Sequence, residues 1–101
     1  MAEIDFKAAR VKMVDGQLRT TDVTKFEVLA AFLEIPREKF VPASKRDIAY
    51  LDDDIEIASG RYLTEPSPLG KLIQLAAIQS TDKVLLVGAG NGYSAAILSR
   101  M

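Results

Sequence analysis

The chain has 101 residues, 49% of them hydrophobic and 27% charged, which suits one small globular domain or part of a larger one. Its 13 basic and 14 acidic residues leave a net charge of −1, so charge gives no argument for nucleic-acid binding. Without cysteine or histidine, disulfides and thiolate chemistry are excluded, and the commonest metal ligand is missing; we predict no metal site. No signal-peptide pattern and no membrane-length apolar run occur, so we expect a cytoplasmic protein that does not contact membranes.

The first third of the chain predicts two helices, over residues 4–18 and 20–35, because apolar residues recur at the spacing of one helical face. The predicted apolar faces comprise Ile4, Ala8, Val11, Val14 and Leu18 in the first helix, and Phe26, Leu29, Ala30 and Leu33 in the second. Thr21 or Asp22 is the predicted cap of the second helix. Pro36 then ends that helix and can begin a short turn, and Val41 is extended before Pro42.

The texture changes after residue 47, where short alternating segments separated by Asp-rich and Ser-Gly turns predict strands or an irregular hairpin up to Leu63. Ser67 and Pro68 predict the cap and first position of a third helix. A buried strand is predicted over Lys83–Val87, followed by a glycine turn and the start of a helix. The order of strand, glycine turn and helix is the opening of an α/β domain.

The glycine turn has its glycines at alternate positions, Gly88, Gly90 and Gly92. Glycines allow a sharp turn and let a ligand approach the backbone, and the following helix start offers unpaired N–H groups. A dinucleotide fingerprint would need a third glycine where Tyr93 stands, and no P-loop lysine follows. The candidate cofactor-binding residues are Val87, Gly88, Ala89, Gly90, Asn91, Gly92 and Tyr93. The alternative is a tight turn of an α/β protein that binds nothing.

The G-x-G-x-G pattern after an apolar strand resembles the first motif of class I S-adenosylmethionine-dependent methyltransferases. Three blocks sharpen the resemblance, to the protein-L-isoaspartate O-methyltransferase family. Residues 36–42, PREKFVP, resemble its Pro-Arg-Glu-x-Phe-Val-Pro segment. Residues 49–52, AYLD, are similar to its Ala-Tyr-x-Asp, and residues 57–66 align with Ile-Gly-x-Gly-Gln-Thr-Ile-Ser-x-Pro. Residues 84–93 resemble its Val-Leu-Glu-Ile-Gly-Thr-Gly-Ser-Gly-Tyr, and together the blocks cover most of residues 29–98.

The resemblance implies a Rossmann-like fold and methyl transfer from S-adenosylmethionine to the carboxylate of an isoaspartyl residue in a damaged protein or peptide. It places Thr64 as the hydroxyl near the reacting centre and the glycine turn as the cofactor seat. A carboxylate with a pKa near 4 is ionised at neutral pH, so this reaction needs no general base. The absence of histidine is therefore compatible with this activity.

The chain departs from the family pattern at several positions where chemistry is expected. The family's Gln-Thr is replaced by Arg61 and Tyr62, its serine by Thr64, and the acidic residue of the glycine strand by Leu86. A permanent cation and a bulky ring near the site leave open a methyltransferase that uses another acceptor. A second alternative is a non-catalytic module in which the exposed strand pairs with another copy, giving a homodimer.

Residues 1–65 are expected to form the N-terminal helices and a hairpin-like, substrate-side segment, and residues 66–101 the start of the cofactor-binding domain. A βαβ unit needs about 30 residues, whereas nine follow Gly92. We therefore expect an α/β fold that is truncated: an N-terminal helical segment plus the first strand, glycine loop and helix of the Rossmann-like domain. We also expect the 101-residue chain to bind the cofactor weakly or not at all and to be inactive alone.

Overall fold

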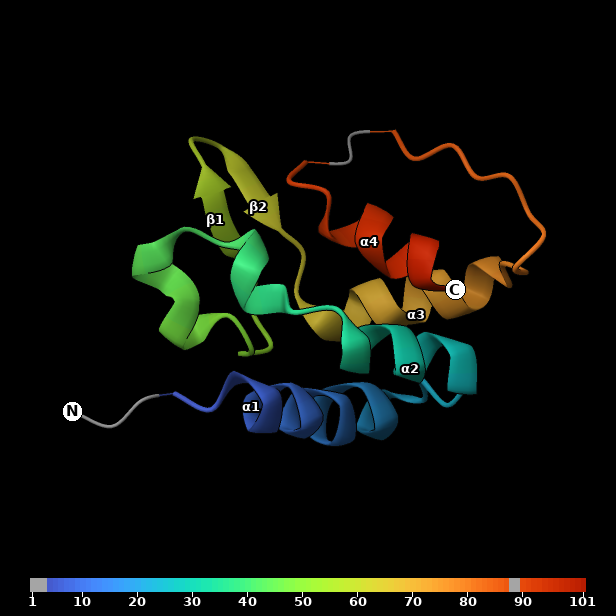
Figure 1. Cartoon of the computed structure of the whole chain (residues 1–101), viewed down its shortest axis with the longest axis horizontal. Coiled ribbons are helices and arrows are strands. Elements are labelled where there is room, and N and C mark those ends of the chain that lie inside the picture. Colours follow the sequence, from blue (N-terminus) through green and yellow to red (C-terminus); the bar gives the residue numbers. More distant parts are fainter. Residues whose placement is uncertain (1–3, 88–89) are drawn as a thin grey trace.

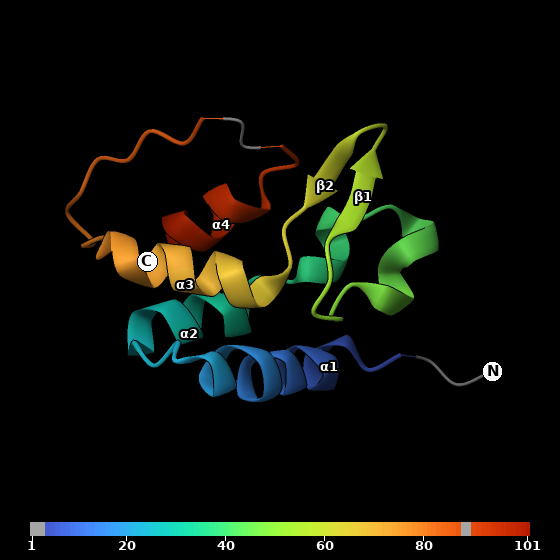
Figure 2. The same cartoon turned by 180° about the vertical axis from the view of Figure 1, so that it is seen from behind.

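Four α-helices and one antiparallel hairpin form the part of the chain that this computed structural model describes, residues 4–87 and 90–101. Helices α1 and α2 lie next to each other, α3 and α4 lie on the other side of α2, and the hairpin stands at one end (Figure 1). Residues 78–87, which follow α3, arch away from the helices, as the view from behind also shows (Figure 2). The elements are α1 Phe6–Met13, α2 Phe26–Glu34, β1 Ile55–Ala58, β2 Arg61–Leu63, α3 Pro66–Ala76 and α4 Tyr93–Arg100.

Asp5 caps the start of α1, because its Oδ1 accepts a hydrogen bond from the Ala8 backbone N–H at 3.0 Å. After α1 the chain continues as a π-helical turn, Val14–Leu18, and a 3₁₀ turn, Arg19–Thr21. The predicted helix is confirmed in extent to within two residues, but its predicted apolar face is partly wrong, because Ile4, Ala8 and Val11 are exposed. The buried residues of this segment are Met13, Val14 and Leu18, which lie at the end of α1 and in the π-helical turn.

Helix α2 begins later than predicted, and neither Thr21 nor Asp22 caps it. Asp22 instead adopts a left-handed conformation, with φ 70°, that turns the chain before α2. The cap comes from α3: Oε1 of Gln74 accepts hydrogen bonds from the backbone N–H groups of Thr24 and Lys25, both at 2.9 Å. The helix turns Val28, Leu29, Ala31 and Phe32 into the core. Phe26, predicted to lie on the apolar face, is 77% exposed.

The acidic residues 52–54 directly precede β1 and form hydrogen bonds with the start of α3. The strand register pairs Ile55 with Leu63 and then slips by one residue between Glu56 and Ala58. Helix α3 begins at Pro66, two residues before the predicted first position, and Ser67 is not its cap. The Ser67 hydroxyl donates to Oδ2 of Asp52 at 2.7 Å and is buried. This contact holds the first turn of α3 against the segment that precedes the hairpin.

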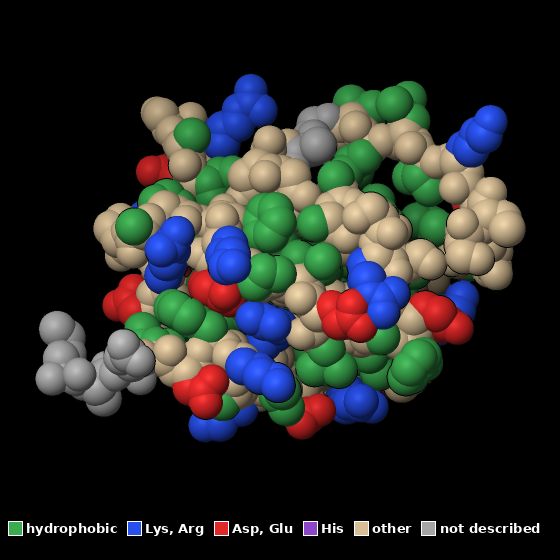
Figure 3. Space-filling view, viewed as in Figure 1, with side chains coloured by type: hydrophobic (Ala, Val, Ile, Leu, Met, Phe, Trp, Pro, Cys, Tyr) green, Lys and Arg blue, Asp and Glu red, His purple; other side chains and the backbone are tan. Residues whose placement is uncertain are grey.

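The buried strand predicted over residues 83–87 is not present. The segment is irregular and exposed, with Leu85 at 88% and Val87 at 84% exposure. In the described part of the chain the sheet contains β1 and β2, and neither of them lies against this segment. An apolar strand becomes buried only when neighbouring strands and helices cover it. Hydrophobic side chains accordingly gather at the surface over this segment (Figure 3). The fold described is therefore helix-rich with a two-stranded sheet.

Candidate functional site

An open groove of about 670 Å³ lies where the three sequence blocks meet. Its walls come from the segment between α2 and β1, from the hairpin, and from the glycine turn. Its volume falls in the range of small-molecule and cofactor sites. The lining residues are Lys39, Phe40, Val41, Pro42, Ile57, Ala58, Arg61, Gly90 and Asn91. A ligand in this groove would contact all three segments at once.

The glycine turn has the backbone geometry for which glycine is required. Gly90 has φ 60° and Gly92 has φ 88°, values that residues with a side chain rarely adopt. A Cβ added at Gly92 would meet nothing within 4 Å, and one at Gly90 would lie 3.9 Å from Cδ1 of Ile57. The backbone is thus open to close approach at both positions. Gly88 and Ala89, also predicted cofactor residues, lie outside the described residues.

Asn91 fixes this turn through its side-chain amide. Its Oδ1 accepts a hydrogen bond from the Tyr93 backbone N–H at 3.2 Å, so it satisfies one free donor at the start of α4. Its Nδ2 donates to the carbonyl oxygen of Phe40, which belongs to another segment that lines the groove. Because one residue bonds both to its own turn and to residue 40, Asn91 connects the glycine turn with the first sequence block.

Tyr93 anchors the glycine turn in the protein core. Its ring is fully buried and packs edge-to-face against Phe40 and Phe32, with centroid separations of 5.4 Å and 6.3 Å. Burial raises the pKa of the Tyr93 phenol, and the nearby Arg37 guanidinium opposes that shift. The phenol is therefore neutral near pH 7, and Tyr93 acts in the described structure as a packing residue directly after the turn.

Arg37 ties the remaining blocks to Tyr93. It is fully buried, and its Nε donates to the Ala49 carbonyl at 2.6 Å while Nη2 donates to the Thr64 carbonyl at 3.0 Å. Its guanidinium carbon lies 5.0 Å from the centroid of the Tyr93 ring, a cation–π distance. Burial lowers the pKa of Arg37, although Tyr93, Tyr50 and Asp52 counteract it. One buried cation thus connects residues 37, 49, 64 and 93.

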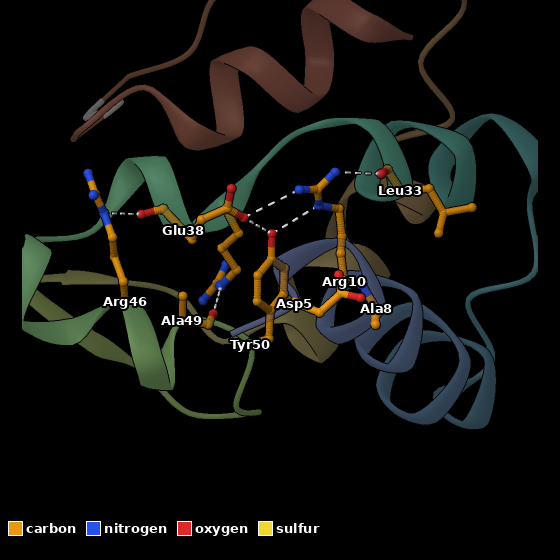
Figure 4. A network of polar contacts seen from close by, with 9 residues as sticks. Asp5, Ala8, Arg10, Leu33, Glu38, Arg46, Ala49 and Tyr50 are labelled. Atoms are coloured by element: carbon orange, nitrogen blue, oxygen red, sulfur yellow. Dashed lines mark hydrogen bonds and ion pairs between the residues drawn. The ribbon is translucent and has the colours of Figure 1, made fainter. Parts of the chain in front are cut away.

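A second polar network joins α1 to the segment between α2 and β1 (Figure 4). The Tyr50 hydroxyl donates to Oε1 of Glu38 and accepts from Nε of Arg10 at 2.9 Å. Arg10 also reaches the Leu33 carbonyl and, at 3.4 Å, the Glu38 carboxylate. Burial, and then the hydrogen bond to Glu38, raise the pKa of Tyr50 to about 12. These contacts hold residues 37–50 in place. Arg10, Glu38 and Tyr50 do not line the groove, so we assign this network a structural role.

The remaining predicted site residues lie around the groove rather than together. Thr64 directly follows β2 and is exposed, and it is not among the residues that line the groove. Val87 is exposed in the irregular segment before the glycine turn. Of the two departures in β2, Arg61 lines the groove, whereas Tyr62 is exposed and pairs with Glu56 in the strand register. Arg61 is therefore a residue of the groove, and Tyr62 is not.

Sequence reasoning missed Arg37, Phe40 and Asn91 as the residues that hold the site together. Arginine is rarely fully buried, and no periodic pattern signals that its donors will be used by distant carbonyls. Asn91 was predicted to contact a cofactor, but its bond to Phe40 depends on tertiary structure. The available signal was that Arg37 and Phe40 lie within the same block that resembles the family.

Comparison with known proteins decides the family. A model of the protein-L-isoaspartate(D-aspartate) O-methyltransferase family matches residues 9–101. The chain belongs to this family. It is 38% identical over 96 residues to the protein-L-isoaspartate O-methyltransferase of Aeropyrum pernix, covering 95% of this chain and 37% of that protein. It is also 38% identical over 98 residues to the protein of the same name from Roseiflexus castenholzii, covering 97% and 44%.

The resemblance predicted from the three blocks is thus confirmed for most of the chain. A third isoaspartate methyltransferase relative, from Anaeromyxobacter, is 37% identical over 92 residues, covering 91% of this chain and 38% of its own length. The chain spans about two fifths of the length of these curated relatives. Within the described residues, no helix is both long and apolar enough to cross a membrane, and no group of His, Cys, Asp or Glu is arranged to hold a metal ion.

Proposed function

We propose that this protein takes part in S-adenosylmethionine-dependent methylation of isoaspartyl residues in damaged proteins or peptides. The observation that carries the proposal is the groove, because its walls come from the blocks at residues 36–42, 57–66 and 84–93. Family membership supports the reaction class, and the curated relatives carry the name of this activity. A site at which all three blocks meet is the natural place for donor and acceptor to come together.

The glycine turn would hold the methyl donor. S-adenosylmethionine supplies a methyl group on a positively charged sulfur, which makes that methyl group open to attack by a nucleophile. The proposed contacts are the backbone of residues 87–92 and the start of α4 at Tyr93. The open approach at Gly90 and Gly92 fits this role, since a side chain at either position would require a strained backbone. Asn91 would keep the turn in register with the acceptor side of the groove.

The acceptor would be a carboxylate that lies in the groove as an anion. Such a group needs alignment and removal of water more than proton transfer. Phe40, Val41, Pro42 and Ile57 supply apolar surface to the walls of the groove. Thr64 is the proposed hydroxyl of the acceptor side, and its backbone position is held by the hydrogen bond from Arg37. Residues 1–65 would then carry the acceptor side and residues 66–101 the donor side.

Two narrower points are part of the proposal. Arg61 lines the groove at a position where the family pattern has glutamine, so a related methyltransferase with a different carboxylate acceptor is the second candidate. The exposed apolar side chains of residues 84–87 favour association with a second copy.

The direct test is binding of two fluorescent hexapeptides that differ only in having an isoaspartyl or a normal aspartyl residue between neutral neighbours. Fluorescence anisotropy measures both affinities on the same protein sample, with circular dichroism as the check that the protein is folded. The proposal expects tighter binding of the isoaspartyl peptide. Equal affinities for the two peptides would contradict the isoaspartyl assignment and favour the second candidate.

A further inference from the structure

Two cationic residues, Lys39 and Arg61, line the groove. Lys39 belongs to the segment between α2 and β1, and Arg61 is the first residue of β2. Neither forms an ion pair with another described residue, since the pairs in residues 4–87 and 90–101 involve Arg10, Arg19 and Arg100. Cations without an internal partner in a groove are available to a ligand of opposite charge.

The strand pattern explains why Arg61 reaches the groove. Side chains alternate along a strand, so Arg61 and the buried Leu63 share one face of β2 while Tyr62 is on the other. Across the hairpin, Ile55 pairs with Leu63 and Glu56 pairs with Tyr62. The carboxylate of Glu56 is therefore on the face opposite to Arg61, beside Tyr62, whose pKa it raises. The register separates the hairpin's cation from the hairpin's own carboxylate.

No aspartate or glutamate is among the described residues that line the groove. Glu38, the neighbour of Lys39 in sequence, is buried and paired with Tyr50 and Arg10. The remaining nearby acids, Asp52 and Asp54, accept hydrogen bonds from the backbone at the start of α3. The lining of the groove thus combines apolar walls with two positive side chains, and the acidic cluster of Asp52, Asp53, Asp54 and Glu65 is not part of that lining.

We infer that Lys39 and Arg61 recognise an acidic side chain next to the isoaspartyl residue, so that the preferred substrate is an acidic isoaspartyl peptide. This rests on the proposed function for the isoaspartyl part, and on the groove's charge for the acidic part. An isoaspartyl residue already carries one carboxylate that must be methylated. Because the groove has two cations, one can pair with the isoaspartyl carboxylate and the other with the acidic residue next to it in the peptide.

The effect should be moderate because both cations are solvent-exposed. Exposed charge pairs strengthen an interaction by about two- to fivefold each. Such attraction is screened over about 10 Å at 0.1 M salt. An acidic neighbour should therefore strengthen binding severalfold at low salt, and the gain should shrink when salt is raised.

The experiment compares four peptides, with isoaspartyl or aspartyl at the centre and with glutamate or glutamine as its neighbour. Binding is measured for the unchanged protein, for Arg61→Gln and Lys39→Gln, and for the control Lys71→Gln on the exposed face of α3. Circular dichroism checks that each variant folds. We expect the glutamate-to-glutamine affinity ratio to fall about two- to fivefold in each groove variant and to stay unchanged in Lys71→Gln.

A ratio that Arg61→Gln and Lys39→Gln both leave unchanged overturns the inference, as does a ratio close to one in the unchanged protein. Failure of the proposed function gives a different result: the glutamate preference remains but isoaspartyl and aspartyl peptides bind equally. The four-peptide design therefore separates the two claims. In the unchanged protein, a glutamate-to-glutamine affinity ratio that falls towards one at high salt further supports recognition of charge.

Discussion

The guanidinium of Arg37 lies 5.0 Å from the centre of the Tyr93 ring, and both side chains are fully buried. The same guanidinium donates to the carbonyls of Ala49 and Thr64. Residues separated by 56 positions in the sequence are thereby joined at one point. The hydrogen bonds of this one side chain hold the acceptor side of the groove, and its contact with Tyr93 connects it to the glycine turn.

Replacing Arg37 should therefore destabilise the protein strongly. Arg37→Gln leaves at least one buried carbonyl without its donor and removes the cation from the Tyr93 ring, with an expected loss of about 2–4 kcal/mol. Arg46→Gln is the matched control, because exposed Arg46 also donates to a backbone carbonyl, that of Glu38. Its expected loss is below about 1 kcal/mol. Urea unfolding measures both, and similar losses would show that burial of Arg37 has no special effect.

The pH dependence of stability should depend on Tyr50. Its pKa is raised from about 10 to about 12, so the fold favours the protonated phenol. The stabilisation is complete below pH 10 and is lost as pH rises from 10 towards 12. The difference in unfolding free energy between the unchanged protein and Tyr50→Phe should therefore narrow over this range. Since Tyr62 and Tyr93 are present in both proteins, a constant difference would contradict the contribution of Tyr50.

Gly70 of α3 packs closely against Leu18 and Val23, so this position should not tolerate a larger residue. A Cβ added at Gly70 would lie 2.7 Å from Cδ2 of Leu18 and 3.3 Å from Cγ2 of Val23, so these side chains would have to move. We expect Gly70→Ala to cost about 1–3 kcal/mol. Gly16→Ala is the control, because nothing lies within 4 Å of its Cβ position. There alanine should stabilise by about 0.5–1 kcal/mol, and thermal unfolding of both variants checks the opposite signs.

Exposed residues 84–87 should make the protein associate. Exposed apolar side chains that are next to one another form a surface that a second copy of the chain can bury. Sedimentation velocity should show dimers that increase with protein concentration, and Leu85→Lys should reduce them. Phe26 is also apolar and exposed but lies on α2, so Phe26→Lys should leave the amount of dimer unchanged. A monomer at every concentration, or equal effects of the two variants, would rule out association through this segment.

Local signals in the sequence predicted the helices and the hairpin well. Apolar spacing located the first two helices, Pro36 ended the second at the observed place, and the Ser-Gly turn separates the two strands. The caps were wrong because the partners come from distant positions: Gln74 caps α2, and Ser67 bonds Asp52 instead of capping α3. Propensity describes neighbours along the chain and does not describe such contacts.

The candidate site was predictable in part. The glycine turn followed from backbone requirements, and the positive φ angles of Gly90 and Gly92 bear out that reasoning. The buried strand over residues 83–87 was not correct, because burial of a strand depends on what lies beside it. The position of Arg61 in the groove and of Tyr62 outside it required the strand register. That register comes from pairing with β1, which no single segment encodes.

We propose above all that the glycine turn beside the groove is the seat of the methyl donor. A titration with S-adenosylhomocysteine, followed by nitrogen-15 and proton correlation NMR, tests it at single residues. We predict weak binding, with Kd on the order of a millimolar, and shifts concentrated at the amides of Gly90, Asn91, Gly92 and Tyr93. Shifts confined to other parts of the chain, or none at saturating ligand, would contradict the claim.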